Sequence, residues 1–184
     1  MYHTTSPPRS RFCYPLLPCT GNGNFFDQFN GKAYPNNDDT LPWATEWIEV
    51  GESDGHTSGD ERVTDYFLEF QLLIEGNDNG GEAVEREADL SGAGFASLSF
   101  AYRRQNLDSA GDYVLVQMPT NGASGLWMEL EKIAGGGTDG SYVTGNYDIT
   151  PYISDRTRVR LLSSPTMGGG DKVWFDEVEI ECQP

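Results

Sequence analysis

The chain has 184 residues, which suits one domain with a tail, because single cores extend to about 200 residues before chains divide. Its 29 acidic and 12 basic residues give a net charge of −17, which repels nucleic acid and anionic lipid surfaces. The 22 Gly, the 10 Pro and the 12% share of aromatic residues favour an all-β protein. No apolar stretch reaches about 18 residues, so we expect no membrane insertion. Because of the negative net charge, we also expect no nucleic acid partner.

The first 23 residues differ from the rest of the chain. They contain four Pro and no acidic residue, a composition typical of a tail or a linker arm. We therefore predict an N-terminal arm over residues 1–23 and a domain over residues 24–184. The apolar side chains of this arm, such as Phe12 and Leu16, could pack on a neighbouring subunit.

The three cysteines, Cys13, Cys19 and Cys182, all lie near the termini. Any two of them can pair, or one can bond to another chain, and their spacing does not choose between these arrangements. Terminal cysteines in an acidic, Gly-rich β protein suggest an oxidising compartment. We expect a protein that is secreted, extracellular or at the cell surface, although its first residues contain no apolar signal-peptide core.

Short segments of alternating apolar and polar residues follow one another through the domain. Phe25 and Phe26 mark a first strand. Further strands are predicted at residues 47–50, 66–74, 94–102, 113–118, 126–133, 142–148, 157–162 and 173–181, with Gly- and Asn-rich turns between them. Such a series of short strands predicts a two-sheet antiparallel β-sandwich of the jelly-roll kind.

The last predicted strand contains a carboxylate among apolar residues. If the strand is unbroken, Trp174, Asp176, Val178 and Ile180 share one face, which should be buried because three of them are apolar. A buried carboxylate is costly unless a cation or hydrogen-bond donors satisfy it. Calcium suits such a site because it binds about six to eight oxygen ligands. The alternatives are a bulge that returns Asp176 to solvent, or hydrogen bonds from backbone N–H groups.

Further calcium ligands are expected near the start of the domain. Asp27 lies among aromatic residues in the first strand, which often runs beside the last strand in antiparallel sandwiches. The Gly-rich segment 49–62 contributes Glu52 and Asp60, and it could wrap around an ion. The candidate ligands of a structural calcium ion are therefore Asp27, Asp176, Asp60 and Glu52.

Several segments resemble jelly-roll modules of secreted bacterial proteins, namely Asn-Phe-Phe-Asp, Ala-Ser-Leu-Ser-Phe-Ala-Tyr-Arg and Val-Trp-Phe-Asp-Glu-Val-Glu-Ile. The resemblance covers about residues 24–182 and is to the galactose-binding-like superfamily, which includes carbohydrate-binding modules and MAM-type domains. It implies a structural calcium ion between the first and last strands, matching Asp27 and Asp176. Many members bind glycans, and others serve in adhesion or assembly.

Glycan binding requires aromatic rings that stack on sugars, with polar groups beside them. Trp127 alternates along its strand with Glu129 and Glu131, so we expect it on the more polar face. The candidate ligand-binding residues are Trp127, Trp47 and Tyr102.

An enzymatic function has little support in the sequence. The two histidines, His3 and His56, lie in the arm and in a Gly-rich loop, and no nucleophile elbow or phosphate-binding loop is present. We therefore predict a non-catalytic binding module with glycan as its expected ligand. The alternative is a structural subunit of a surface layer, adhesin or filament, whose partners are neighbouring protein subunits, including further copies of this chain.

Overall fold

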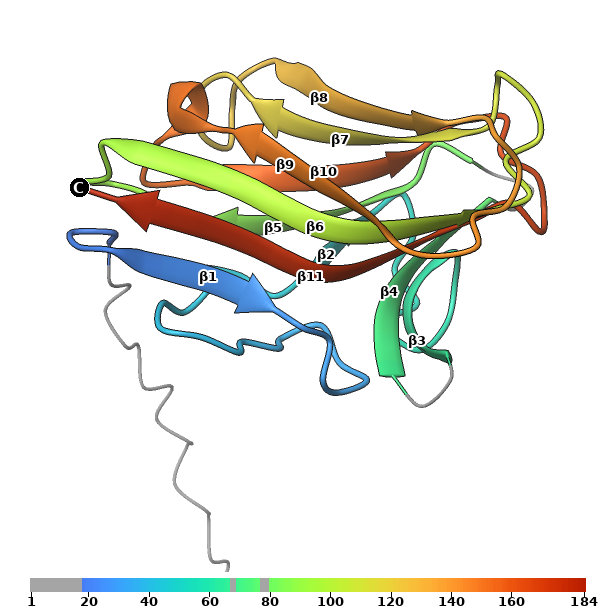
Figure 1. Cartoon of the computed structure of the whole chain (residues 1–184), viewed down its shortest axis with the longest axis horizontal. Coiled ribbons are helices and arrows are strands. Elements are labelled where there is room, and N and C mark those ends of the chain that lie inside the picture. The colour runs from blue at the N-terminus through green and yellow to red at the C-terminus, as the bar shows by residue number, and fades with distance from the viewer. Residues whose placement is uncertain (1–17, 67–68, 77–79) are drawn as a thin grey trace, which may run out of the picture.

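The computed structural model describes residues 18–66, 69–76 and 80–184, and these form two antiparallel sheets packed face to face (Figure 1). This arrangement confirms the predicted all-β jelly-roll sandwich. The first sheet has the order β3-β4-β11-β6-β9, with β1 also paired to β11, and the second has the order β2-β5-β10-β7-β8.

The strands of the first sheet are β1 (Gly23–Asp27), β3 (Glu61–Tyr66), β4 (Glu69–Glu75), β6 (Phe95–Gln105), β9 (Val143–Asp148) and β11 (Lys172–Gln183). The strands of the second sheet are β2 (Ile48–Val50), β5 (Ala83–Ala88), β7 (Tyr113–Pro119), β8 (Trp127–Ala134) and β10 (Thr157–Ser163). β3 was not predicted as a separate strand, and β5 was not predicted at all.

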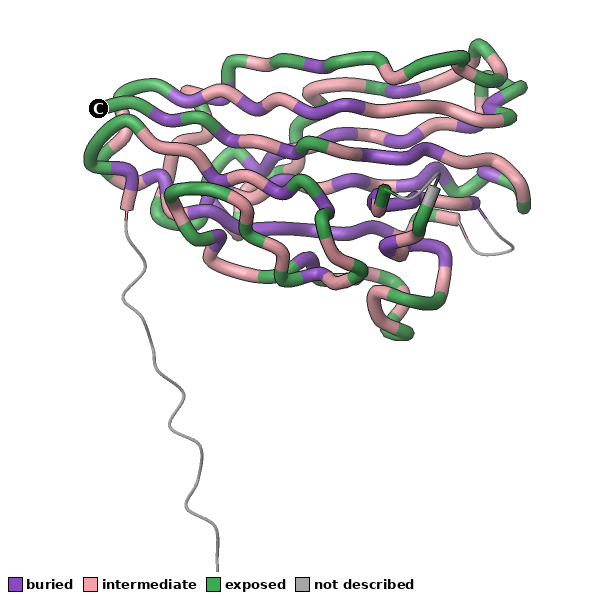
Figure 2. Tube along the Cα trace, turned by 60° about the horizontal axis from the view of Figure 1, so that its bottom comes forward, coloured by how far each residue is buried: buried purple, intermediate pink, exposed green. Residues whose placement is uncertain are grey.

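The core lies between the two sheets and follows the alternation of the strands. Buried residues alternate with more exposed ones along several strands (Figure 2). In β10, for example, Val159 and Leu161 are buried while Arg158 and Arg160 are only partly so. Because successive side chains of a strand point to opposite faces, each strand presents one apolar face to the core and one polar face outward.

The central strand of the first sheet, β11, contains a bulge. Its pairing with β6 shifts register between Asp176 and Glu179, and Glu177 has a φ of 50°. The extra residue changes which positions face the core, from Val173 and Phe175 before the bulge to Val178 and Ile180 after it. The expectation that Trp174, Asp176, Val178 and Ile180 share one buried face is therefore wrong, because the bulge inverts the alternation.

The bulge also divides the edge of β11 between two partners. Before it, residues from Lys172 to Phe175 pair with β4, and after it, residues from Val178 to Cys182 pair with β1 (Figure 1). Asp176 and Glu177 thus lie where neither strand covers β11. This junction is the place of a pocket described below.

The beginning of the described chain is part of the folded unit. Cys19 is buried and forms a disulfide with Cys182, across a sequence separation of 163 residues. This bond is one of the pairings that the sequence left open, and it places the last residues of the predicted arm in the domain. Cys13 lies outside the described residues.

One helix occurs among the described residues, the 3₁₀ turn η1 (Thr150–Tyr152). In the described part of the chain, no helix is long and apolar enough to cross a membrane.

The disulfide generates a first prediction. Replacing both Cys19 and Cys182 by Ser is expected to lower the free energy of unfolding by about 2–5 kcal/mol, because the bond restricts a long loop of the unfolded chain. Denaturant titration measures the loss, and Cys13→Ser is the control for removing a thiol alone. An unchanged free energy of unfolding in the double variant would show that the bond contributes nothing.

Candidate ligand-binding surface and acidic sites

A buried ion pair joins the two sheets through the core. Asp27, the last residue of β1, contacts the guanidinium of Arg86 from β5, and both side chains are almost completely buried. The Trp47 indole N–H donates to Asp27 Oδ2 at 2.9 Å, and the Phe29 amide donates to Asp27 Oδ1 at 2.8 Å. Both carboxylate oxygens therefore have partners.

The guanidinium of Arg86 also has several partners in the core. It donates to the backbone carbonyls of Thr45 and Asn36, and its Cζ lies 4.5 Å from the centre of the Trp43 ring. Burial lowers the pKa of Arg86 to about 10, which leaves the side chain charged at neutral pH. The charge of Asp27 is thus balanced by a protein cation.

Asp27 and Asp176 do not fit the calcium site that the resemblance implies. A shared ion needs free carboxylate oxygens that face one another, whereas both oxygens of Asp27 are occupied inside the core. The side chain of Asp176 precedes the bulge and follows the alternation of Trp174, away from the core face of Val173 and Phe175.

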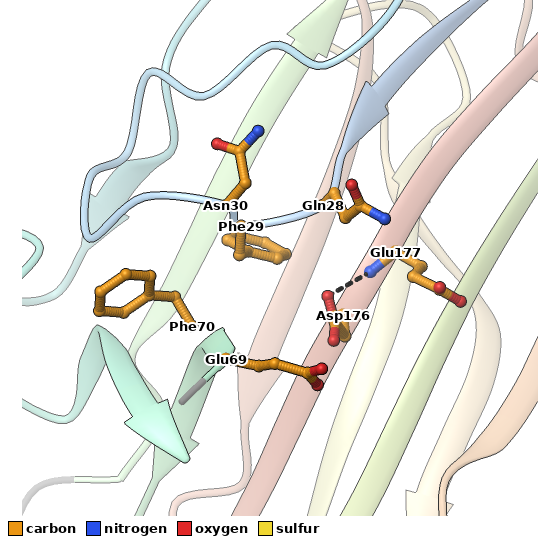
Figure 3. Close-up of a pocket in the computed structure, with 7 residues that line it drawn as sticks. All are labelled: Gln28, Phe29, Asn30, Glu69, Phe70, Asp176 and Glu177. Atoms are coloured by element: carbon orange, nitrogen blue, oxygen red, sulfur yellow. Dashed lines mark hydrogen bonds between the residues drawn. The ribbon is translucent and has the colours of Figure 1, made fainter. Parts of the chain in front are cut away.

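Asp176 instead lines a pocket of about 350 Å³ at the junction of β1, β4 and β11, together with Gln28, Phe29, Asn30, Glu69, Phe70 and Glu177 (Figure 3). The side chain of Glu69 extends toward Asp176, and the amide of Glu177 donates to Asp176 at 2.8 Å (Figure 3). Burial raises the pKa of Asp176 to about 6, and the charges of Glu177 and Glu69 act in the same direction. The pocket is polar, and its carboxylates repel each other.

A second acidic group lies at the edge of the sandwich near β2 and β3. Carboxylate oxygens of Glu52, Glu61 and Glu82 lie within 4.8 Å of one another. Glu52 was a predicted ligand, whereas Glu61 and Glu82 were not. Asp60, also predicted, adjoins the group, and its backbone amide donates to Glu52 Oε2 at 3.0 Å. The Gly-rich spacing around Glu52 was the signal for this group, but nothing in the sequence pointed to Glu82 as its neighbour.

The outer face of the second sheet carries a row of polar side chains across four strands. The register places Glu85 beside Arg160, Arg160 beside Gln117, and Gln117 beside Glu129. Arg160 Nε lies 3.4 Å from a carboxylate oxygen of Glu85, and Gln117 Oε1 has no hydrogen-bond partner in the described structure. We call Glu85, Arg160, Gln117 and Glu129 the polar row.

More ion pairs extend the polar row on its β5 side. Arg158 binds both Glu85 and Glu87 at 2.8 Å, and Arg156 binds Glu87 at 3.0 Å. Burial acts to raise the pKa of Glu87, but the hydrogen bonds from Arg156 and Arg158 outweigh it and lower that pKa. The carboxylate of Glu87 is thus held ionised, and the ion pairs hold both carboxylates in fixed positions.

Two aromatic rings lie on the same face. Trp127 is half-buried, with the guanidinium of Arg160 4.7 Å from its ring centre, and Lys132 Nζ lies 3.9 Å from the ring centre of Tyr113. This placement agrees with the expected position of Trp127 on the polar side of its strand. Tyr113 reaches this face through the alternation of side chains along β7.

The other two expected aromatic platforms are placed differently. Trp47 is 1% exposed and bound to Asp27, so the prediction that it stacks on a ligand is wrong, since its ring is enclosed in the core. Tyr102 is half-buried, with its ring centre 6.1 Å from that of Phe100. It faces the core side of the first sheet, away from the polar row.

Several solved structures share the jelly-roll fold of this chain. A family 22 xylan-binding domain from Paenibacillus barcinonensis has a TM-score of 0.55 and 13% identity, with 89% of this chain and 97% of that chain covered. A family 29 carbohydrate-binding module complexed with mannohexaose has a TM-score of 0.52 and 16% identity, with 87% and 92% covered.

The fold also occurs among adhesins. A cleaved adhesin domain of Lys-gingipain from Porphyromonas gingivalis has a TM-score of 0.53 and 17% identity, with 85% of this chain and 96% of that chain covered. Identities at this level show a shared fold alone. No protein-family profile and no curated protein sequence matches the chain.

The buried ion pair generates a second prediction. Arg86→Met leaves the Asp27 carboxylate without its cation, so the free energy of unfolding should fall by about 3–5 kcal/mol. Arg156→Met is the matched control, because the guanidinium of Arg156 is 57% exposed and solvent replaces its pairing. Denaturant titration of both variants tests this difference, and equal losses would refute the role assigned to the core pair.

The pocket generates a third prediction, on pH. The pKa of Asp176 rises from 3.8 to about 6 on folding, so the folded state holds this proton more tightly than the unfolded chain. Stability should therefore fall as the pH rises from about 4 to above 6. Asp176→Asn removes this effect and should raise the melting temperature at pH 7.5 but not at pH 4. A lower melting temperature of the variant at pH 7.5 would contradict the prediction.

Proposed function

We propose that the chain is a non-catalytic extracellular module that binds a glycan on the outer face of its second sheet. The observation that carries this proposal is the polar row with Trp127 beside it, because the row joins charged groups and an aromatic ring on one continuous face. Sugars present hydroxyl groups around the ring and C–H groups above and below it. Such a face can meet both.

The chemistry of the row suits hydroxyl groups. The carboxylates of Glu85 and Glu129 accept hydrogen bonds, the guanidinium of Arg160 donates them, and Gln117 does both. Hydrogen bonds to charged groups are shorter and stronger than those between neutral groups. The carbonyl oxygen of Gln117 is buried in the middle of the row and has no hydrogen-bond partner in the described structure, so a ligand reaches it only if the side chain turns outward.

The ion pairs prepare this surface for binding. The contacts of Arg158 and Arg160 with Glu85 fix three long side chains before a ligand arrives, so less conformational entropy is lost on binding. The half-buried ring of Trp127 is likewise held beside Arg160. A sugar can stack on Trp127 while its hydroxyl groups reach the polar row.

The similar solved structures support the ligand class. They include modules with bound mannohexaose or cellulohexaose and a xylan-binding domain. We therefore propose linear polysaccharides of this kind as ligands, and these three sugars are the first probes.

The same features support a non-catalytic role. Glycoside hydrolysis requires one carboxyl group with a raised pKa opposite a second, free carboxylate. On the proposed face, Glu85 and Glu87 are instead paired with arginines, and the pKa of Glu87 is lowered. The Cys19–Cys182 disulfide supports a secreted or surface location, because such bonds persist in oxidising compartments.

Neighbouring protein subunits are the alternative partner. Leu126 is 79% exposed and Met128 is 45% exposed at β8, an edge strand of the second sheet. An edge strand with apolar side chains can pair with another chain. Assembly through the arm stays a prediction, because Phe12 and Leu16 lie outside the described residues.

The test is the affinity of the full chain for mannohexaose, cellohexaose and xylan, measured by calorimetry. At least one should bind, and Trp127→Ala should weaken that binding about tenfold or more, as for an aromatic anchor. Met128→Ala is the matched control, since it removes an exposed side chain from the opposite face of the same strand. Binding that Trp127→Ala leaves unchanged would refute the proposed face, and no binding to any of the three sugars would refute the proposed ligand class.

A further inference from the structure

Three glutamate carboxylates lie close together beside the segment that follows β2. Glu52 lies in this segment, Glu61 begins β3 of the first sheet, and Glu82 directly precedes β5 of the second sheet. Their oxygens lie within 4.8 Å of one another. We call these three residues the glutamate cluster.

The middle member of the cluster is enclosed. Glu61 is 0% exposed, and neither of its carboxylate oxygens has a hydrogen-bond partner in the described structure. A buried carboxylate without donors or a cation is among the most costly arrangements in a protein. The side chain nevertheless points into a group of further carboxylates, and a cation bound among them would satisfy its oxygens.

The backbone holds the cluster together. Glu52 accepts hydrogen bonds from the amides of Asp60 at 3.0 Å and Glu61 at 2.8 Å, which fix its carboxylate beside that of Glu61. At Gly59, which has a φ of 78°, a Cβ would lie 2.4 Å from an oxygen of Glu52. Only glycine permits this close approach, so the local sequence is suited to keeping the carboxylates in contact.

The surroundings supply negative charge rather than a balancing cation. The charges that act most strongly on Glu61 are those of Glu52, Glu82 and Asp60. Burial and these neighbouring carboxylates raise the pKa of Glu61 to about 10, which shows how unfavourable a negative charge is at this position. This situation contrasts with Asp27, whose charge is balanced by Arg86.

We propose that Glu52, Glu61 and Glu82 bind a calcium ion that ties the start of β3 to the start of β5. Calcium is bound by oxygen ligands at about 2.3–2.6 Å, so ligands on opposite sides of the ion lie up to about 5 Å apart, a spread that the cluster matches. The ion offsets two of the three negative charges of the cluster. Zinc is disfavoured because the cluster contains no His or Cys ligand.

The ion has a structural role in this proposal. Glu61 belongs to the first sheet and Glu82 adjoins the second, so one ion holds the two sheets together at their edge. The site is separate from the polar row, so the test of the calcium site does not depend on whether the chain binds a glycan.

The experiment measures the melting temperature of the full chain after EDTA treatment and after addition of calcium chloride. At a calcium concentration about 100 times the dissociation constant, the melting temperature should rise by about 5–10 °C. Glu82→Gln and Glu61→Gln should abolish most of this rise. Because Glu82 is only half-buried, we expect Glu82→Gln to fold. It therefore tests the site even if Glu61→Gln does not fold.

The matched control is Asp176→Asn, which removes one carboxylate from the other acidic pocket and should leave the calcium response intact. Magnesium chloride at the same concentration separates specific binding from screening of the net charge. Hydrogen exchange should also slow on calcium addition at residues 51–61 in the wild type. No rise with calcium, an equal rise with magnesium, or a response lost in Asp176→Asn and kept in Glu82→Gln would each overturn the proposal.

Discussion

The buried pair of Asp27 and Arg86 determines how the two sheets face each other. It joins the end of β1 to the middle of β5, and the core residues Trp43 and Trp47 enclose it. Because strand neighbours alternate, an inward Arg86 directs Glu85 and Glu87 outward. These are the carboxylates that Arg158 binds. A shift of β5 by one residue would turn these carboxylates toward the core and the arginine away from it, so the polar row depends on this one core contact.

The sequence predicted the fold well where apolar and polar residues alternate, as in β6, β7 and β11. It missed β5 because the strand reads Ala-Val-Glu-Arg-Glu-Ala, and a charged residue stands at a core position. That charge is tolerated only because Asp27 lies opposite, which no local pattern reveals. The bulge at Glu177 was equally hidden, since the identity of this residue does not distinguish a regular strand from an interrupted one.

For the candidate sites too, the sequence predicted what depends on local pattern and missed what depends on tertiary packing. The position of Trp127 followed from alternation along one strand, whereas the polar row depends on the register of four strands far apart in the sequence. Sequence spacing identified Glu52 and Asp60 as acidic residues of one loop, but the approach of Glu82 depends on how β5 packs. The carboxylate of Asp176, expected inside the core, lines a pocket at the bulge instead. Local pattern thus predicts faces, and tertiary packing decides which residues meet.

Glycan binding on the outer face of the second sheet can be tested by titrating isotope-labelled protein with mannohexaose and following the backbone amide chemical shifts. If the proposal is correct, the shifts cluster at Glu85, Arg160, Gln117 and Trp127 on the neighbouring strands β5, β10, β7 and β8. Shifts confined to the pocket of Gln28, Glu69 and Asp176, or to the outer face of the first sheet, would refute binding at this face.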